Sequence, residues 1–382
     1  THTVLELRIK IPKNGIHSCV CHYFFVILHA KLVYCNKMKR KIAIIAGGDS
    51  SEYEVSLRSA AGLRGWISEA GYDVTIVVLR GLEWKAIPDD VMGAASQLDD
   101  EMMKQACPID KNDFSFTRGG VKHTFDFAYI TIHGTPGENG ILQGYLDMIG
   151  LPYSCCGVLA ASMTFNKYAC NHYLAGFGFH ISKSILLRKQ EYRMMNKDHR
   201  LRIIDQVINE LGLPCFIKSN VGGSSYGCTK AKKAESILPA IERAFEEGDE
   251  VICEAYMKGT EVTCGVYKTQ DKAVAFPITE VVTKNEFFDY DAKYRGQVDE
   301  ITPARIPDNV RDTIQAETLR IYDIIGAQGI IRVDWIITDT INLLEVNTTP
   351  GMTPTSFIPQ QVRAAGLDIK DVLTDIIEDK FA

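Results

Sequence analysis

The chain has 382 residues, and at about 150 residues per domain this length predicts two or three domains. Apolar residues make up 46% and charged residues 24%, proportions that exclude a disordered tail, a collagen-like fibre, a small disulfide scaffold and a multispan membrane protein. The formal net charge of −6 argues against nucleic acid as a partner. An acidic chain that binds anions must gather its Lys and Arg locally, so we expect basic residues beside Gly-rich loops.

The cysteines show no metal-binding pattern. There are 11 of them, with no Cys-x-x-Cys pair and no Cys/His spacing typical of a zinc site. Cys155 and Cys156 are adjacent, and Cys19 and Cys21 are too close for ordinary tetrahedral ligation. We therefore expect mostly buried, reduced thiols, which indicate a cytoplasmic location.

The first 37 residues differ from the rest in charge and hydrophobicity. They carry a local charge of +4, which leaves −10 for the remainder. Their most apolar stretch, residues 19–35, contains two His and one Lys and is shorter than the ~20 apolar residues of a spanning helix. No Ala-x-Ala-like cleavage site follows it. We interpret Met38 as the start and residues 1–37 as a non-native or disordered extension; a membrane anchor and an unusual extra element are the alternatives.

From Met38 onward, short apolar runs alternate with amphipathic stretches, the pattern of an α/β (α+β) fold. The predicted strands are 41–46, 74–79, 127–133, 215–218, 250–257, 261–267, 273–279, 330–337 and 341–346. The predicted helices are 56–70, 141–148, 166–175, 201–211, 235–247 and 308–326.

These elements group into three α/β domains. We place the N-terminal domain at 38–154, the central domain at 155–259 and the C-terminal domain at 260–382. The stretch 283–306 is polar and has no clear period. Such long loops in a compact domain are usually functional, which predicts a lid.

A hairpin near the C-terminus carries the strongest chemical signal. Two apolar strands flank a turn at residues 339–340, and a two-residue turn there places Asp334 opposite Glu345. Side chains alternate along a strand, so Asn347 shares the face of Glu345. Carboxylate and amide oxygens suit Mg²⁺. The alternative is a solvated strand face with ordinary acids.

Three Gly-rich loops follow predicted strands, where ligands bind in open α/β sheets. Lys218 precedes the loop 219–227, whose backbone N–H groups could approach a phosphate, although the spacing is neither a P-loop nor a dinucleotide fingerprint. Glu52, in the loop 47–56, could hold an ammonium group, or complement the start of a helix. His133 begins the third loop. The alternatives are an ordinary Gly/Ser turn and a structural histidine.

Taken together, six segments identify a family. They are GGDSSEYEVS (47–56), HGTPGENG (133–140), KSNVGGSSYG (218–227), FFDYDAKY (287–294), RVDW (332–335) and LLEVNTTPGMT (343–353). From Met38 to its end the chain resembles the D-alanine–D-alanine ligase family of the ATP-grasp superfamily. Two departures are Ser219, where a Pro is usual, and Asn139, where an Asp is common.

The resemblance implies an ATP-grasp fold with ATP between the central and C-terminal domains. The implied nucleotide contacts come from Lys167, Lys218, Glu254, Glu261 and Lys293. Two Mg²⁺ ions, which Mn²⁺ could replace, would be held by Asp334, Glu345 and Asn347.

The resemblance also implies two D-alanine subsites. Glu52 would bind the first ammonium, with His133 near its carboxylate, and Ser356 would anchor the second carboxylate. Arg332 and the N–H of Gly351 would form an oxyanion hole. Tyr294, in the predicted lid, would link to Ser224 and Glu52.

The implied activity is ATP-dependent ligation of two D-alanines through a D-alanyl phosphate, for peptidoglycan precursors, by a cytoplasmic homodimer without nucleic-acid or membrane partners. One alternative is another ATP-grasp ligase, such as one that joins D-alanine to D-lactate. The other is a nucleotide-binding regulator without turnover. The group that deprotonates the incoming second ammonium is not evident from the sequence.

Overall fold

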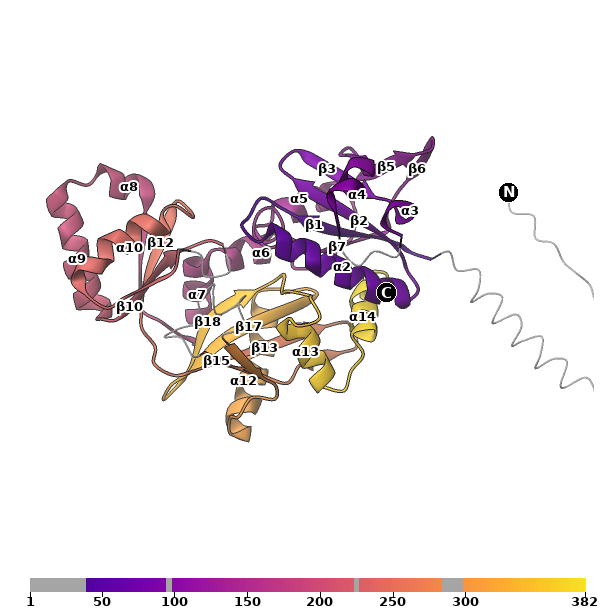
Figure 1. Cartoon of the computed structure of the whole chain (residues 1–382). Coiled ribbons are helices and arrows are strands. Elements are labelled where there is room, and N and C mark those ends of the chain that lie inside the picture. Colours follow the sequence, from indigo (N-terminus) through magenta and orange to yellow (C-terminus); the bar gives the residue numbers. More distant parts are fainter. Residues whose placement is uncertain (1–38, 94–97, 223–226, 284–297) are drawn as a thin grey trace, which may run out of the picture. The chain divides into compact units, whose positions relative to one another are not determined.

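The computed structural model describes residues 39–93, 98–222, 227–283 and 298–382 (Figure 1). Residues 40–382 form one compact unit with three β-sheets in it. The predicted extension lies outside the described residues, so its interpretation stays a prediction. Helices cover the sheets, and the mixed α/β class predicted from the sequence is confirmed.

The first sheet has the strand order β6-β5-β4-β3-β2-β1-β7. Its centre is β1 (Lys41–Gly47), which pairs in parallel with β2 (Asp73–Arg80) and β7 (Phe127–Ile130). After its first residue β1 is buried throughout, as expected for a parallel strand covered on both faces. The remaining strands form an antiparallel ladder that the sequence did not predict: β3 (Glu83–Ile87), β4 (Cys107–Asp110), β5 (Ser115–Arg118) and β6 (Val121–His123).

The two faces of β1 belong to two different hydrophobic cores. Ile42 and Ile44 pack in one core with helix α2 (Tyr53–Glu69). Ala43 and Ile45 pack in the other with helix α5 (Ile141–Ile149). Between β3 and β4 lie two short helices, α3 (Asp89–Met92) and α4 (Asp100–Gln105). The central strand is thus fixed from both sides, and with it the loop that follows its carboxyl end.

The second sheet has four strands in the order β11-β10-β12-β9. They are β9 (Ser184–Arg188), β10 (Cys215–Ser219), β11 (Thr229–Ala231) and β12 (Glu250–Ala255). Helices around this sheet, visible in Figure 1, are α8 (Lys189–Met194), α9 (Lys197–Leu211) and α10 (Ile237–Ala244), with a short 3₁₀ turn η1 (Ala234–Ser236) before α10.

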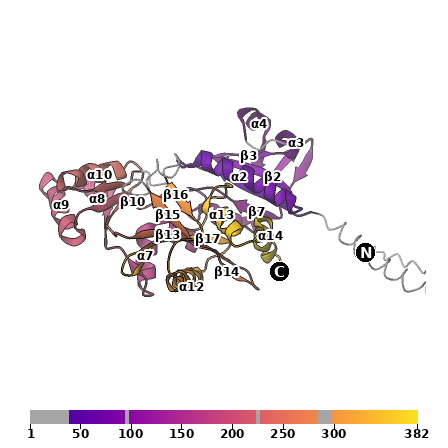
Figure 2. The same cartoon turned by 60° about the horizontal axis from the view of Figure 1, so that its bottom comes forward.

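The third sheet has the order β16-β15-β13-β17-β18-β8, with β14 beside β13. Its strands are β8 (His180–Ile181), β13 (Thr260–Lys268), β14 (Ala273–Ala275), β15 (Thr279–Thr283), β16 (Val298–Ile301), β17 (Ile330–Ile337) and β18 (Ile341–Asn347). Helix α12 (Asp308–Ile324) lies alongside β13 and β14 (Figure 2). The single strand predicted at 273–279 is wrong, because Pro277 has no N–H to continue the ladder and the chain divides into β14 and β15.

Packing crosses the predicted domain boundaries at two places. Helices α6 (Val158–Phe165) and α7 (Lys167–Ala175), together with β8, pack against β18 of the third sheet. The last helices, α13 (Phe357–Ala364) and α14 (Ile369–Asp379), which the sequence did not predict, contribute to the α2 core. The boundaries themselves stay predictions.

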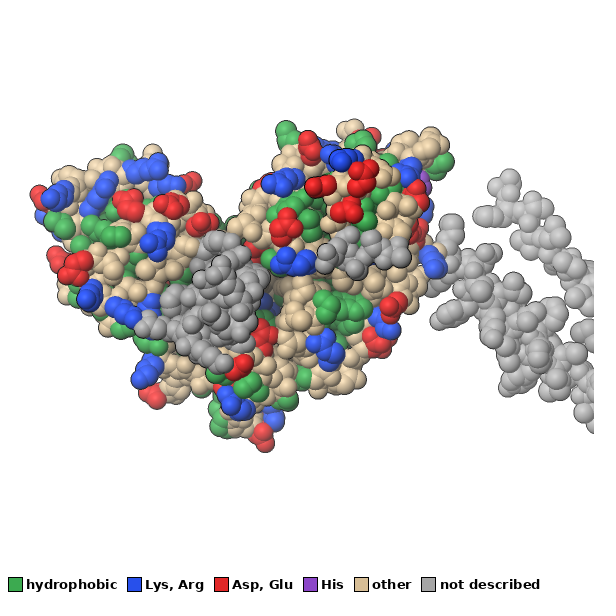
Figure 3. All heavy atoms as spheres, in the orientation of Figure 1, with side chains coloured by type: hydrophobic (Ala, Val, Ile, Leu, Met, Phe, Trp, Pro, Cys, Tyr) green, Lys and Arg blue, Asp and Glu red, His purple; other side chains and the backbone are tan. Residues whose placement is uncertain are grey.

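On the face seen in Figure 3, Lys/Arg and Asp/Glu side chains are interspersed among small hydrophobic patches. Within the described ranges, no helix is both long and apolar enough to cross a membrane. The eight described cysteines are all thiols, and most are buried, as the sequence predicted.

Leu373 tests the docking of α14. Its side chain is 0% exposed in the core shared with α2, so Leu373→Ala should lower the free energy of unfolding by about 2–5 kcal/mol. The measurement is urea denaturation followed by circular dichroism. Leu82→Ala is the control, since Leu82 is 88% exposed and its loss should cost less than ~0.5 kcal/mol. Equal losses in the two variants would mean that α14 does not support the first sheet.

Candidate active site

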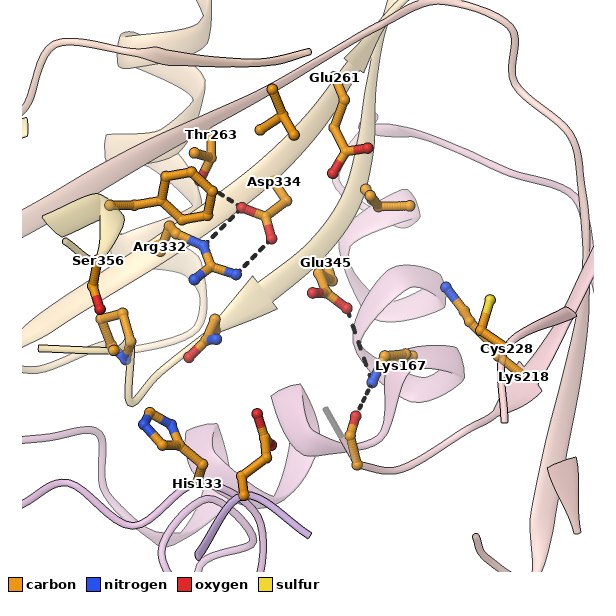
Figure 4. A pocket seen from close by; sticks show the side chains of 18 of the residues that line it. His133, Lys167, Lys218, Cys228, Glu261, Thr263, Arg332, Asp334, Glu345 and Ser356 are labelled. Atoms are coloured by element: carbon orange, nitrogen blue, oxygen red, sulfur yellow. Dashed lines mark hydrogen bonds and ion pairs between the residues drawn. The ribbon is translucent and has the colours of Figure 1, made fainter. Parts of the chain in front are cut away.

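A cavity of about 480 Å³ opens among the three sheets (Figure 4). It gathers every predicted site residue that the structure describes: Glu52, His133, Lys167, Lys218, Glu254, Glu261, Arg332, Asp334, Glu345, Asn347, Gly351 and Ser356. Ser224, Lys293 and Tyr294 lie outside the described residues, so their predicted roles stay predictions. Residues more than 300 positions apart in the sequence thus share one cavity.

The loop after β1 presents Glu52 at the start of α2. Gly47 has φ of +94°, and a Cβ there would collide with the carbonyl of Leu79, so only glycine fits this turn. The N–H of Gly47 donates to Ser56 Oγ at 2.9 Å, and Ser50 Oγ donates to the carbonyl of His133 at 2.7 Å. The first bond closes the Glu52 loop on itself, and the second joins it to the His133 loop.

His133 is a buried neutral imidazole at the cavity wall. Burial lowers its pKa, Arg332 lowers it further, and Glu52 opposes both. Its Nε2 atom has no hydrogen-bond partner within the described part of the chain, although the side chain is only 6% exposed. A buried polar atom without a partner is costly, so this atom is suited to meet a ligand.

Glu138, which the sequence analysis did not assign, lies in the same wall. Its Oε2 accepts from the N–H of Gly134 at 2.7 Å. Burial, and then the charge of Glu52, raise the pKa of Glu138 to about 8. At neutral pH this carboxyl is therefore mostly protonated.

Two lysines also line the cavity. Lys218, on β10, forms an ion pair with Glu254 of β12 at 2.6 Å. Burial alone would lower the pKa of Lys218, but Glu254 and Glu345 outweigh it, so the pKa is raised and the ammonium stays charged. Lys167, at the start of α7, donates from Nζ to the carbonyl of Gly222 at 2.6 Å and lies 3.9 Å from Glu345.

The β17–β18 hairpin places Asp334 opposite Glu345, as predicted, but by a different route. Three residues, not two, connect Ile337 to Ile341, which alone would shift the register by one. A bulge between Asp334 and Trp335 compensates with one extra residue, Leu344, on β18. Leu344 and Glu345 both line the cavity as a result.

Asp334 is already engaged by neighbouring side chains. Arg332 donates from Nε to Oδ1 at 2.9 Å and from Nη2 to Oδ2 at 2.8 Å, and Thr263 donates to Oδ1 at 2.5 Å (Figure 4). Burial alone would lower the pKa of Arg332, but Asp334 outweighs it and raises the pKa. Residues two apart on a strand share a face, and this signal could have predicted the pair from the sequence.

The loop before α13 closes the cavity near Gly351. Ser356 Oγ accepts from the N–H of Thr353 at 3.1 Å and lies 2.7 Å from Thr353 Oγ1. Met352 N–H donates to Ser59 Oγ of α2 at 3.4 Å. Hydroxyls therefore gather at the N-terminus of an eight-residue helix, an end that favours negative charge.

Lys218 and Lys167 lie beside the loop that contains Gly222, but the described lining as a whole is more acidic than basic. Its basic residues are Arg58, Lys167, Lys218 and Arg332, whereas its acidic residues are Glu52, Glu138, Glu254, Glu261, Glu300, Asp334 and Glu345. Arg58, Glu138, Thr263, Cys228 and Glu300 were not predicted to lie here. Only Glu138 lies in one of the six family segments, and its sequence neighbours do not distinguish it from a surface acid.

The chemistry of the donors fits a divalent cation. Asp334, Glu345 and Asn347 offer two carboxylates and an amide on adjacent strands, the oxygen donors that Mg²⁺ prefers. No cluster of three or more His, Cys, Asp or Glu suited to a metal occurs among the residues that the structure describes. The acidic lining nonetheless requires cations if it is to accept an anionic ligand.

Comparison with known proteins identifies the family of the chain. Two family models match, "D-ala D-ala ligase N-terminus" over residues 41–156 and "D-ala D-ala ligase C-terminus" over residues 174–378. The D-alanine–D-alanine ligase of Phocaeicola vulgatus is 60% identical over 347 residues, which cover 90% of this chain and 100% of that protein. That of Porphyromonas gingivalis W83 is 52% identical over 345 residues, 90% of this chain and 98% of the relative.

Two solved structures share the fold. D-alanyl-alanine synthetase A from Vibrio cholerae has a TM-score of 0.76 and 26% identity, covering 89% of this chain and 98% of that one. The VanG D-Ala:D-Ser ligase from Enterococcus faecalis has a TM-score of 0.73 and 28% identity, covering 89% and 99%. The fold is therefore that of an ATP-grasp enzyme, as predicted. More narrowly, the chain belongs to the D-alanine–D-alanine ligase family.

Glu138 makes the stability of the protein depend on pH. Its pKa of about 8 exceeds the ~4.3 of an unfolded glutamate, so its stabilising contribution is complete below pH ~4.3 and is lost as the pH rises through about 8. Glu138→Gln imitates the protonated carboxyl. The variant should gain about 2–4 kcal/mol over wild type near pH 8.5 and almost nothing near pH 4.5.

Urea denaturation at the two pH values measures this difference. The exposed Glu83→Gln on β3 serves as the matched control and should show no such dependence. A gain that is the same at both pH values would contradict the assigned titration of Glu138.

Proposed function

We propose that this chain, an ATP-dependent ligase by its family, joins two D-alanine molecules into D-alanyl-D-alanine by way of D-alanyl phosphate. The family makes this dipeptide for cell-wall synthesis. The observation that carries the proposal is the single cavity in which Glu52, Arg332 and Ser356 lie with Lys167 and Lys218. It combines groups for an ammonium, an oxyanion, a carboxylate and phosphates.

ATP occupies the end of the cavity between the second and third sheets. Lys167 and Lys218 contact its phosphates, and both are held by partners that a nucleotide can replace. Glu254 takes the adenine amino group and Glu261 the ribose hydroxyls. Glu254 is only 6% exposed and lies on the strand next to Lys218, which supports a specific contact rather than a solvated acid.

The first D-alanine lies between the first sheet and the Gly351 loop. Glu52 binds its ammonium, and the unpartnered Nε2 of His133 binds near its carboxylate. Because His133 is neutral, it attracts the carboxylate only by a hydrogen bond and does not trap it as an ion pair. That carboxylate must leave its partners when it attacks ATP.

The reaction has two steps. The carboxylate of the first D-alanine attacks the γ-phosphate of ATP, giving D-alanyl phosphate and ADP, while Lys167 and Lys218 neutralise the transferring charge. The amine of the second D-alanine then attacks the acyl carbon, and phosphate leaves. Arg332 and the N–H of Gly351 stabilise the tetrahedral oxyanion, and Ser356 holds the carboxylate of the second substrate.

Asp334, Glu345 and Asn347 would hold Mg²⁺, and Mn²⁺ could replace it. When bound, the ions supply positive charge to the phosphates in an otherwise acidic cavity. Arg332 donates to Asp334 from Nε and Nη2, which leaves the N–H groups of Nη1 outside this pair and able to serve an oxyanion. The family resemblance also supports a cytoplasmic location, a homodimer, and the lack of a nucleic-acid or membrane partner.

The direct experiment is ADP release with Mg-ATP and D-alanine, L-alanine, D-serine or D-lactate, with product analysis. We expect turnover with D-alanine and accumulation of the dipeptide. If none of these four compounds supports ADP release, the chain is a nucleotide-binding protein without catalytic turnover. Ester formation in preference to dipeptide would identify a D-alanine–D-lactate ligase instead.

Glu345 tests the metal site. Glu345→Gln removes one anionic ligand but keeps the shape, so kcat/KM for Mg-ATP should fall by about a hundredfold or more. The assay is ADP release at saturating Mg²⁺. Asp339→Asn, an exposed carboxylate in the turn of the same hairpin, is the control and should retain wild-type rates. An unchanged kcat/KM in Glu345→Gln would show that Glu345 is not a ligand of the metal.

A further inference from the structure

Glu300 is a carboxylate of the cavity that the mechanism above leaves unused. It lies on β16, where it pairs across the ladder with Val281 of β15. It lines the same cavity as Arg332, Thr355 and Ser356. We propose that Glu300 receives the ammonium group of the second D-alanine, and so selects an amine over a hydroxyl as the attacking group. This inference rests on the proposed function.

Helix α13 fixes the position of Glu300. The side-chain amide of Gln360 donates to Glu300 Oε2 and also to the carbonyl of Thr355, the latter at 2.6 Å. One amide group thus ties the carboxylate to the residue that precedes Ser356. The other oxygen, Oε1, accepts no hydrogen bond from the residues that the structure describes, so it can bind a further donor.

An amino acid whose carboxylate binds at Ser356 needs an anionic partner nearby for its ammonium group. Ser356 and the N-terminus of α13 are suited to a carboxylate. The ammonium of the same amino acid is one carbon away from that carboxylate, so its partner must lie beside Ser356. Glu300 meets this condition through Gln360.

Other described carboxylates of this part of the cavity are less suited. Asp334 has both oxygens paired with Arg332. Glu138 has a pKa of about 8 and is mostly uncharged at neutral pH. Glu52 is assigned to the first substrate. Glu300 is therefore the group that the geometry leaves for the second ammonium.

Glu300 is also placed to take the proton that the ammonium must lose. Burial raises its pKa, while Gln360 and Arg332 oppose the rise. Among its neighbours Arg332 of β17 is charged, whereas Gln360 of α13 and Val281 of β15 are not. One N–H proton passes to the carboxylate, and the freed lone pair forms the C–N bond. The C–O bond to phosphate breaks, and a second N–H proton leaves with the phosphate.

The test compares Glu300→Gln with wild type. The variant keeps the shape and the acceptor for Gln360 but removes the charge. The KM for the second D-alanine should rise about ten- to a hundredfold, because a charge-assisted hydrogen bond is lost. The KM values for ATP and for the first D-alanine should stay within roughly twofold. In competition with D-lactate, the ester fraction of the product should increase.

Hydroxylamine, a small uncharged nucleophile, separates this role from a general defect. It traps D-alanyl phosphate as the hydroxamate without needing a partner for an ammonium. Glu300→Gln should therefore form hydroxamate at nearly the wild-type rate while dipeptide synthesis falls. Glu300→Asp, which keeps the charge on a shorter side chain, should lie between wild type and Glu300→Gln.

Asp299→Asn is the matched control, since Asp299 is the exposed neighbour on β16 and does not line the cavity. An unchanged KM for the second D-alanine in Glu300→Gln would overturn the proposal. An equal loss of hydroxamate and dipeptide synthesis in Glu300→Gln would also overturn it. The same holds if Glu300→Asp makes dipeptide no faster than Glu300→Gln. If wild type itself makes neither ADP nor dipeptide, the proposed function fails and this inference fails with it.

Discussion

The register of β17 against β18 is the constraint on which the site depends. A three-residue connection and a one-residue bulge together keep Asp334 opposite Glu345. Either feature alone would move every side chain of one strand to the opposite face, because side chains alternate with a period of two. The carboxylates would then point into a core of Val333, Trp335 and Leu343, where unpaired charge is costly. The cavity and the hydrophobic core are thus specified by the same pairing.

Most long elements with a clear hydrophobic pattern could be predicted from the sequence, whereas the shortest strands could not. The buried run of β1 and the long helices α2 and α12 were anticipated to within a few residues. The antiparallel ladder β3–β6 was missed because its strands are three to five residues long and carry polar residues, so no period is visible. Pro277 was a readable signal that divided one predicted strand into two.

The members of the site were easier to predict than its electrostatics. The family resemblance implied that Glu52, Lys218 and Glu345 share one site, and the cavity contains all three. The excess of acidic residues in that cavity could not be predicted from the sequence, since these side chains come from separate sheets. Glu300 gave no signal of its own, because it lies within the polar stretch 283–306, in which neighbouring residues show no pattern.

The docking of α14 on α2 has a consequence for the order of events during synthesis. Ile42 and Ile67, from the start of the fold, share a core with Leu373 and Ile377, from its end. Helix α2 can cover this face of the first sheet as soon as it emerges, and α5 can cover the opposite face, but the part of the core that α13 and α14 complete stays open while the ribosome translates the rest of the chain. Until the last helix emerges, the apolar side chains of α2 that meet α14 stay exposed on the nascent chain, and exposed apolar side chains are what chaperones bind.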